Sequence, residues 1–259
     1  MIRKIFVLCT LGTVLSLTAC RDVFDHLYDD SASTMHISND QLYVDASSWT
    51  DWYYLDLKAV HDSLKSNWQY APSSAWVSRK IPTEKAEGVD SAETKNGIYT
   101  YWYDVFGKGL SNYEYQSFYP TEPQPEPENW SIAVHRNNVR TNGGEVLETS
   151  YWLMEQLPAT SEAFKDSVFT ADEWSEMDVW TVKDKMLQGI IGNQGIKINK
   201  VLSSWLKPNI PPMPPTYDQN NHIFIVRFAD ATCAALKLEN YMSTTGTKCC
   251  LTIKYKYPY

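Results

Sequence analysis

The chain has 259 residues, of which 23 are basic and 31 are acidic, and its formal net charge is −8 at pH 7. No block of Lys or Arg stands out, which argues against nucleic acid as a partner. Aromatic residues make up 14% of the chain, with ten Trp and seventeen Tyr. One hydrophobic core does not usually bury so many aromatic side chains, so the composition favours a β protein with aromatic binding surfaces.

The N-terminus has the parts of a secretory signal. Arg3 and Lys4 precede an apolar stretch over 5–19, which is shorter than the roughly twenty residues of a membrane-spanning helix. The stretch Leu17-Thr18-Ala19-Cys20 resembles the lipobox of bacterial lipoproteins, in which the Cys becomes the lipidated first residue. An ordinary signal peptide that happens to contain a Cys is the alternative. We expect residues 1–19 to be a lipoprotein signal peptide and Cys20 to carry the lipid anchor.

Residues 20–40 are polar and acidic and are predicted to form a lipidated tether. Residues 41–259 are then expected to form one domain. A strand is predicted near Tyr53, where Tyr53, Leu55 and Leu57 alternate with Tyr54, Asp56 and Lys58. Because a helical stripe also fits 57–68, that stretch stays open between strand and helix.

The middle of the chain contains a Pro-rich connector and a second predicted strand. Pro120 to Pro127 is typical of an extended connector. After it, alternation over 130–135 predicts a strand that ends before Asn142-Gly143-Gly144, with His135 expected to be a hydrogen-bonded structural residue. Thr170 and Glu173 have the spacing of a capping box, which predicts a short helix.

The C-terminal part contains the clearest strand signals. A stiff loop is predicted over 208–215, with strands over 223–228, 234–238 and 251–257. A hairpin turn at Thr244-Thr245-Gly246 would place Cys233 near Tyr257 and away from Cys249, so buried free thiols are expected there.

Motifs for catalysis and metal binding are missing from the sequence. No two of the five His have the spacing of a metal site, and neither Cys-x-x-Cys nor Gly-x-Ser-x-Gly occurs. An enzyme is therefore not expected, and a binding protein is favoured.

Three stretches resemble the HmuY-like haem-binding lipoproteins of Bacteroidota. They are Val44-Asp45-Ala46-Ser47 with the following aromatics, the block from Trp130 to Gly144, and the C-terminal part from Pro215-Thr216-Tyr217 through Ile223 to Tyr257. The resemblance implies an all-β fold in a single domain, with short helical pieces and a mobile clamp that grips haem. It also implies that residues 61–128 are a long insertion.

The haem ligands in this chain cannot be the two His that the resemblance implies for the family, because this sequence has no His at either position. The position of one family His, between Trp205 and Tyr217, is taken by Ile210, and the stretch 165–190 that would supply the other contains no His. Met213, Met177 and Met186 are therefore the candidate ligands of haem iron, because a thioether is a soft donor that suits it. Each Met could instead be filler of the core.

Two functions remain open from the sequence. The first, implied by the resemblance, is haem capture by a lipoprotein of the outer membrane at the cell surface, with handover to a TonB-dependent outer-membrane transporter. The second is binding of a glycan or another small ligand on the same β scaffold.

Overall fold

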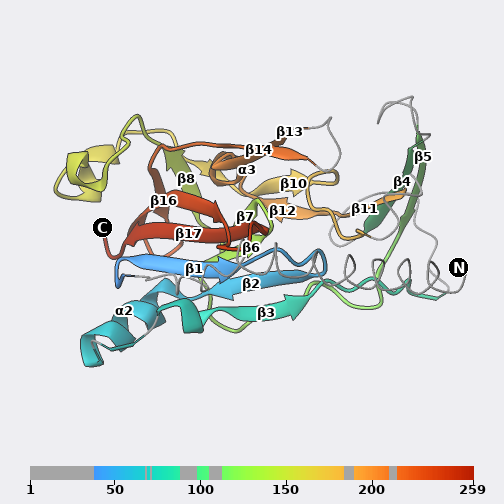
Figure 1. Cartoon of the computed structure of the whole chain (residues 1–259), viewed down its shortest axis with the longest axis horizontal. Coiled ribbons are helices and arrows are strands. Elements are labelled where there is room, and N and C mark those ends of the chain that lie inside the picture. Colours follow the sequence, from blue (N-terminus) through green and yellow to red (C-terminus); the bar gives the residue numbers. More distant parts are fainter. Residues whose placement is uncertain are drawn as a thin grey trace, which may run out of the picture. The chain divides into compact units, whose positions relative to one another are not determined.

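The computed structural model describes residues 38–67, 69–70, 72–87, 98–104, 113–183, 190–209 and 215–259. Residues 37–259 form one compact unit. Within the described residues the strands form antiparallel sheets joined mainly by hairpins and loops, so the predicted all-β fold is confirmed (Figure 1).

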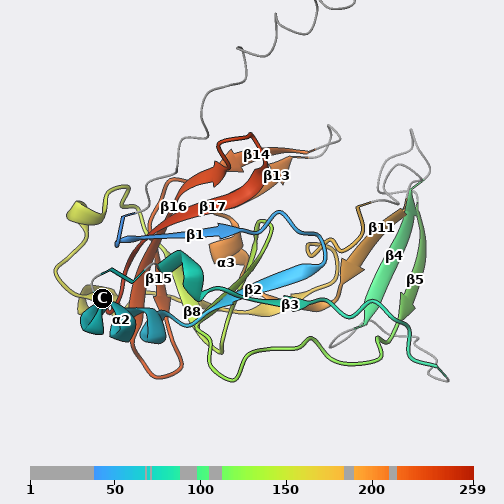
Figure 2. The same ribbon diagram turned by 60° about the horizontal axis from the view of Figure 1, so that its bottom comes forward.

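The largest sheet contains six strands in the order β1-β17-β16-β15-β8-β9 among the described residues. The predicted C-terminal strands are all found in it. Its bounds are β1 Gln41–Asp45, β8 Glu145–Glu148, β9 Thr170–Ala171, β15 Phe224–Arg227, β16 Cys233–Met242 and β17 Lys248–Lys256. The first strand pairs with the last, from Gln41 opposite Lys254 to Asp45 opposite Cys250, and the two lie side by side in Figure 2.

A second sheet has the order β3-β2-β6-β7 in the described part of the chain. Its strands are β2 Asp51–Leu55, β3 Val77–Lys80, β6 Ile132–His135 and β7 Asn138–Thr141. Every residue of β6 is buried, with Ile132 and Val134 in one apolar core and Ala133 in another. This sheet is therefore a middle layer with apolar packing on both faces.

Three smaller sheets complete the described strands. They consist of β4 Tyr99–Asp104, β5 Tyr113–Phe118 and β11 Ile190–Gln194, of β10 Glu173–Ser175 with β12 Ile196–Ile198, and of β13 Leu206–Asn209 with β14 Thr216–Gln219. The last pair is a hairpin whose strands stand on either side of residues 210–215.

Two α-helices and three short 3-10 helices lie in the described residues. They are α2 Leu57–Ser66, α3 Lys200–Ser203, η1 Pro72–Ala75, η2 Met154–Gln156 and η3 Ser161–Phe164. Of the stretch 57–68, which the sequence left open between strand and helix, residues 57–66 form the helix α2. The Asp56 carboxylate caps its N-terminus by accepting hydrogen bonds from the Lys58 and Ala59 N–H groups.

The predicted helix at Thr170 is wrong. Residues 170 and 171 pair with β8, and 173–175 pair with β12. Between them the Asp172 carboxylate accepts from the Thr141 N–H at 2.7 Å and from the Thr141 hydroxyl at 2.8 Å. Residues on both sides of Asp172 therefore take part in β pairing with distant strands, so tertiary pairing overrides the local helix signal.

The three cysteines near the C-terminus are free thiols and buried, as predicted. Cys233 accepts at its carbonyl from the Tyr259 N–H at 2.9 Å, far along β16 from the turn that precedes Cys249. The hairpin register therefore keeps Cys233 apart from the other two cysteines.

Candidate functional site

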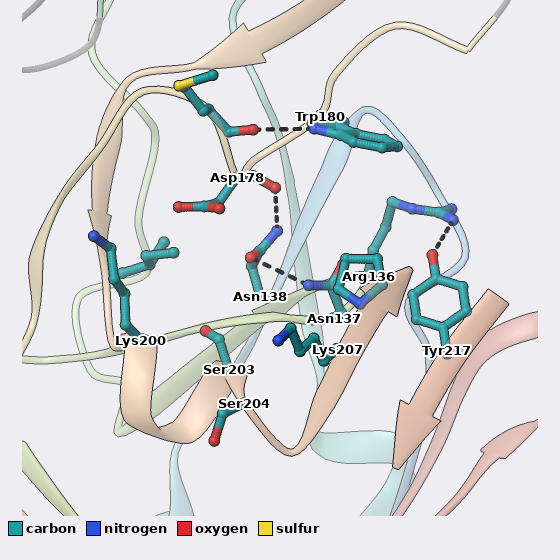
Figure 3. A pocket seen from close by; sticks show the side chains of 13 residues that line it. Arg136, Asn137, Asn138, Asp178, Trp180, Lys200, Ser203, Ser204, Lys207 and Tyr217 are labelled. Atoms are coloured by element: carbon teal, nitrogen blue, oxygen red, sulfur yellow. Dashed lines mark hydrogen bonds between the residues drawn. The ribbon is translucent and has the colours of Figure 1, made fainter. Parts of the chain in front are cut away.

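The first cavity, of about 530 Å³, lies where four elements converge. These are the turn between β6 and β7, the segment 177–180, helix α3, and the β13–β14 hairpin. Cavities of about 300 to 1,000 Å³ are the usual size for small-molecule and cofactor sites. Figure 3 shows the side chains that line this one.

Arg136 occupies the turn between β6 and β7 and is held from three sides. Its guanidinium donates to the Ser47 carbonyl at 2.8 Å and to the Tyr217 hydroxyl at 3.2 Å. It also lies 4.1 Å from the centre of the Trp49 ring, a cation–π arrangement. The backbone of Arg136 has φ 57°, which is uncommon for a residue other than Gly, and such strain often accompanies functional sites.

Tyr217 on β14 contacts Arg136 and so connects the β13–β14 hairpin to the cavity. Burial is the main reason that the pKa of its phenol is raised to about 12. The phenol therefore stays protonated at neutral pH and can accept the hydrogen bond that Arg136 donates (Figure 3). This bond links the turn of the middle sheet to the hairpin.

Trp180 forms an aromatic wall of the cavity. Its ring stacks on that of Trp49, with centroids 5.9 Å apart and an interplanar angle of 24°. Its indole N–H donates to the Met177 carbonyl at 3.0 Å, and the Asn138 amide donates to the Asp178 carbonyl at 2.8 Å. These bonds fix the segment 177–180 against β7.

Positive charge dominates the described lining of this cavity. Its cations are Arg136, Lys200 at the start of α3 and Lys207 on β13, and its one carboxylate is that of Asp178. Lys200 also lies 3.2 Å from the carboxylate of Glu173, in an exposed pair. Such a lining favours an anionic ligand, because the positive side chains attract it.

The structure places some of the predicted site residues. Met177 lines the cavity and is 55% exposed, so its thioether is accessible and it is not core filler. Tyr217 also lines the cavity, whereas Trp205 is fully buried and donates to the Asn137 carbonyl at 3.2 Å. The remaining predicted residues lie outside the described residues: Cys20, Met186, Ile210 and Met213.

Several residues of the cavity were missed by sequence reasoning. Arg136 is far from Lys200 and Lys207 in the sequence, and no motif connects it with them. The one available signal was the turn residue pair Asn137-Asn138 after a strand, which marks a hairpin tip. The stacking of Trp49 on Trp180 joins residues that are likewise distant in sequence.

The described residues contain no group of three or more His, Cys, Asp or Glu side chains that could hold a metal ion. In the same part of the chain, no helix has the length and apolar character to cross a bilayer.

The sequence family described as HmuY protein matches residues 48–255. The chain belongs to the HmuY family. The resemblance found in the sequence is thereby confirmed, and the family match includes both the cavity and the β13–β14 hairpin. No curated protein matches the chain by sequence.

Solved structures with the same fold agree with membership of the HmuY family. A predicted lipoprotein of Bacteroides fragilis has 27% identity and a TM-score of 0.58, over 85% of this chain and 89% of that one. A protein of Bacteroides vulgatus, described as a candidate HmuY-like haem-binding protein, has 27% identity and a TM-score of 0.56, over 85% and 91%. Apo PinO of Porphyromonas gingivitis shares the fold at 20% identity, with a TM-score of 0.61 over 86% and 97%.

Proposed function

We propose that this protein is a lipid-anchored haem-binding protein of the outer membrane, exposed at the cell surface, which takes up haem in the first cavity. The observation that carries the proposal is the convergence at that cavity. The segment that contains Met177 and the hairpin that contains Tyr217 are the two parts of the chain from which the family resemblance expects iron ligands, and both border it.

The chemistry of the lining suits haem. Haem is a flat aromatic ring with two carboxylates and an iron ion at its centre. Trp180 offers an aromatic face, Arg136, Lys200 and Lys207 offer positive charge for the carboxylates, and Met177 offers a thioether. Met213 and Met186 remain candidate ligands alongside Met177.

Titration of haemin into the purified protein tests this proposal. We expect a sharp Soret band that saturates near one haem per protein, both as isolated and after reduction with dithionite. A featureless response that rises without saturation, like that of haemin in buffer, would overturn the assignment of haem as the ligand.

Handover to a TonB-dependent outer-membrane transporter is the further part of the proposal. A protein tethered at the membrane surface can deliver a ligand over the reach of its tether, which for roughly twenty extended residues is on the order of 60 Å. We expect haem loaded on the protein to move to the transporter when the two are mixed in detergent, seen as a loss of the Soret band from the protein once it is separated from the transporter. Retention of that band in the presence of the transporter would argue against handover.

A further inference from the structure

A second cavity, of about 640 Å³, is lined by Trp49, whose ring stacks on Trp180 of the first cavity. It is bordered by β1, the loop before β2, helix η1 and the start of β3. Because Trp49 lines this cavity and stacks on Trp180 of the first one, the two tryptophan rings form a partition between the cavities.

Aromatic and hydroxyl side chains make up most of the described lining. The aromatic residues are all half-buried, so each presents part of its ring to the cavity: Tyr43, Trp49, Tyr53 and Trp76. The serines are Ser47, Ser48, Ser73 and Ser78. Such a surface combines apolar faces with many hydrogen-bonding groups that carry no charge.

The charges that border this second cavity cancel. Asp45 and Lys183 are its charged residues in the described part of the chain. The first cavity instead has an excess of positive charge, so the two would select different ligands. A balanced lining does not favour an anion such as haem, and suits a neutral ligand rich in polar groups.

Asp45 can accept further hydrogen bonds. Its Oδ1 atom accepts from the Ser47 N–H at 3.0 Å and from the Cys250 thiol at 3.5 Å. Burial alone would raise the pKa of Asp45, but the hydrogen bonds from Ser47 and Cys250 outweigh it and lower the pKa. A carboxylate has about four acceptor sites, so capacity remains for hydroxyl groups of a ligand.

The two phenols stay protonated at neutral pH. Burial is the main reason that the pKa of Tyr43 is raised to about 12, and it also raises the pKa of Tyr53. Each phenol can therefore donate one hydrogen bond and accept another. The cavity thus contains groups that both give and receive hydrogen bonds from hydroxyls.

We propose that the second cavity binds a neutral carbohydrate. The C–H face of a sugar ring packs on the half-buried aromatic rings, and its hydroxyls donate to Asp45 and exchange hydrogen bonds with the phenols and serines. The partition of Trp49 and Trp180 separates this ligand from haem, so one protein molecule can hold both. The inference goes beyond haem binding and does not depend on it.

Screening of the full-length protein in detergent on an array of neutral glycans tests the proposal, followed by calorimetric titration of the best glycan. We expect saturable binding that Asp45→Asn weakens roughly tenfold, since a charge-assisted hydrogen bond is lost, and that Tyr43→Ala also weakens. Trp152→Ala, at a 58% exposed residue that does not line the cavity, is the matched control and should bind like the wild type. Urea unfolding of each variant separates loss of binding from loss of folding.

Binding of haemin distinguishes the two sites. The Asp45→Asn variant should keep the haemin titration of the wild type, because Asp45 does not line the first cavity. Absence of binding to every neutral glycan on the array would overturn the proposal. Equal glycan binding by the wild type, Asp45→Asn and Tyr43→Ala would also overturn it, as would loss of glycan binding on substitution of Lys200 and Lys207.

Discussion

The Nε2 atom of His135 lies 2.8 Å from the main-chain carbonyl oxygen of Trp180. Its Nδ1 atom lies 2.9 Å from the carbonyl oxygen of Asp51, so the ring connects the wall of the first cavity to the middle sheet. A neutral imidazole has one N–H and can donate to only one of two carbonyls. The two carbonyls therefore favour the protonated ring and raise its pKa. Burial, which is complete here, has the larger effect and lowers the pKa of His135 to about 4.

This lowered pKa predicts that stability decreases in mild acid. Between pH 6.5 and 4 the unfolded chain binds a proton at His135 that the folded chain does not, so the free energy of unfolding decreases as the pH falls through that window. The full effect is about 3 kcal/mol, at roughly 1.4 kcal/mol per pKa unit. Urea unfolding at pH 7 and pH 4.5 should show a smaller difference for His135→Gln than for the wild type. His61→Gln, on α2, is the control, and an unchanged pH dependence in His135→Gln would refute the assignment.

The positive lining of the first cavity predicts that haemin binding depends on salt. We expect Lys200→Gln combined with Lys207→Gln to weaken binding about five- to tenfold at low ionic strength, because each exposed charge pair contributes up to about 1 kcal/mol. At high salt the difference should shrink, since screening weakens the attraction in the wild type. Haemin titrations at two salt concentrations measure both effects.

The control for that prediction is a pair of lysines on α2. Lys58→Gln with Lys65→Gln removes the same charge from a helix that does not line the cavity. If this control weakens haemin binding as much as the cavity variant does, the effect arises from net charge and not from the site.

Thioether ligation predicts tighter haem binding in the reduced state. Thioethers favour ferrous over ferric iron, so affinity should rise when dithionite is added. Met213→Ala should weaken binding and alter the reduced spectrum, and Met177→Ala should do the same if the exposed thioether in the cavity is the opposing ligand. Met242→Ala, near the hairpin turn between β16 and β17, should leave the spectrum unchanged. If Met213→Ala and Met177→Ala both gave the haemin titration curves of the wild type, neither residue would be an iron ligand.

Membrane attachment is predicted to depend on Cys20. Its thiol is the acylation site in the lipobox interpretation, so Cys20→Ala should yield an unlipidated protein. Cell fractionation together with incorporation of a labelled fatty acid measures this. A variant that still carries the label and sediments with membranes would show that the anchor lies elsewhere.

Several strands of the fold could be predicted from the sequence because their alternation has direct physical meaning. In β17, Leu251, Ile253 and Tyr255 belong to the main core, and the same period was visible in the sequence. Prediction was harder in β6, since burial on both faces leaves little polar contrast along the strand. Strict alternation over 130–135 would put Trp130 on the face of Ile132 and Val134, but Trp130 packs in the other core.

The candidate site could be predicted only in part. The family resemblance led to Met177 and to the Tyr217 hairpin, and both line the first cavity. The contact of Arg136 with Trp49, and of Trp49 with Trp180, depends on how the layers pack, and no local pattern encodes it. The second cavity is formed in the same way, by side chains from β1, β2 and η1 that lie side by side only in the folded chain.

The pairing of β1 with β17 also determines how the domain would respond to mechanical load. The chain enters the domain through β1, and all five residues of that strand pair with β17 in register. Hydrogen bonds of an antiparallel pair run perpendicular to the strands, so a pull along β1 from its N-terminal end shears all of them at once and does not peel them one by one. A tether attached there would therefore load the hydrogen bonds between β1 and β17 in shear.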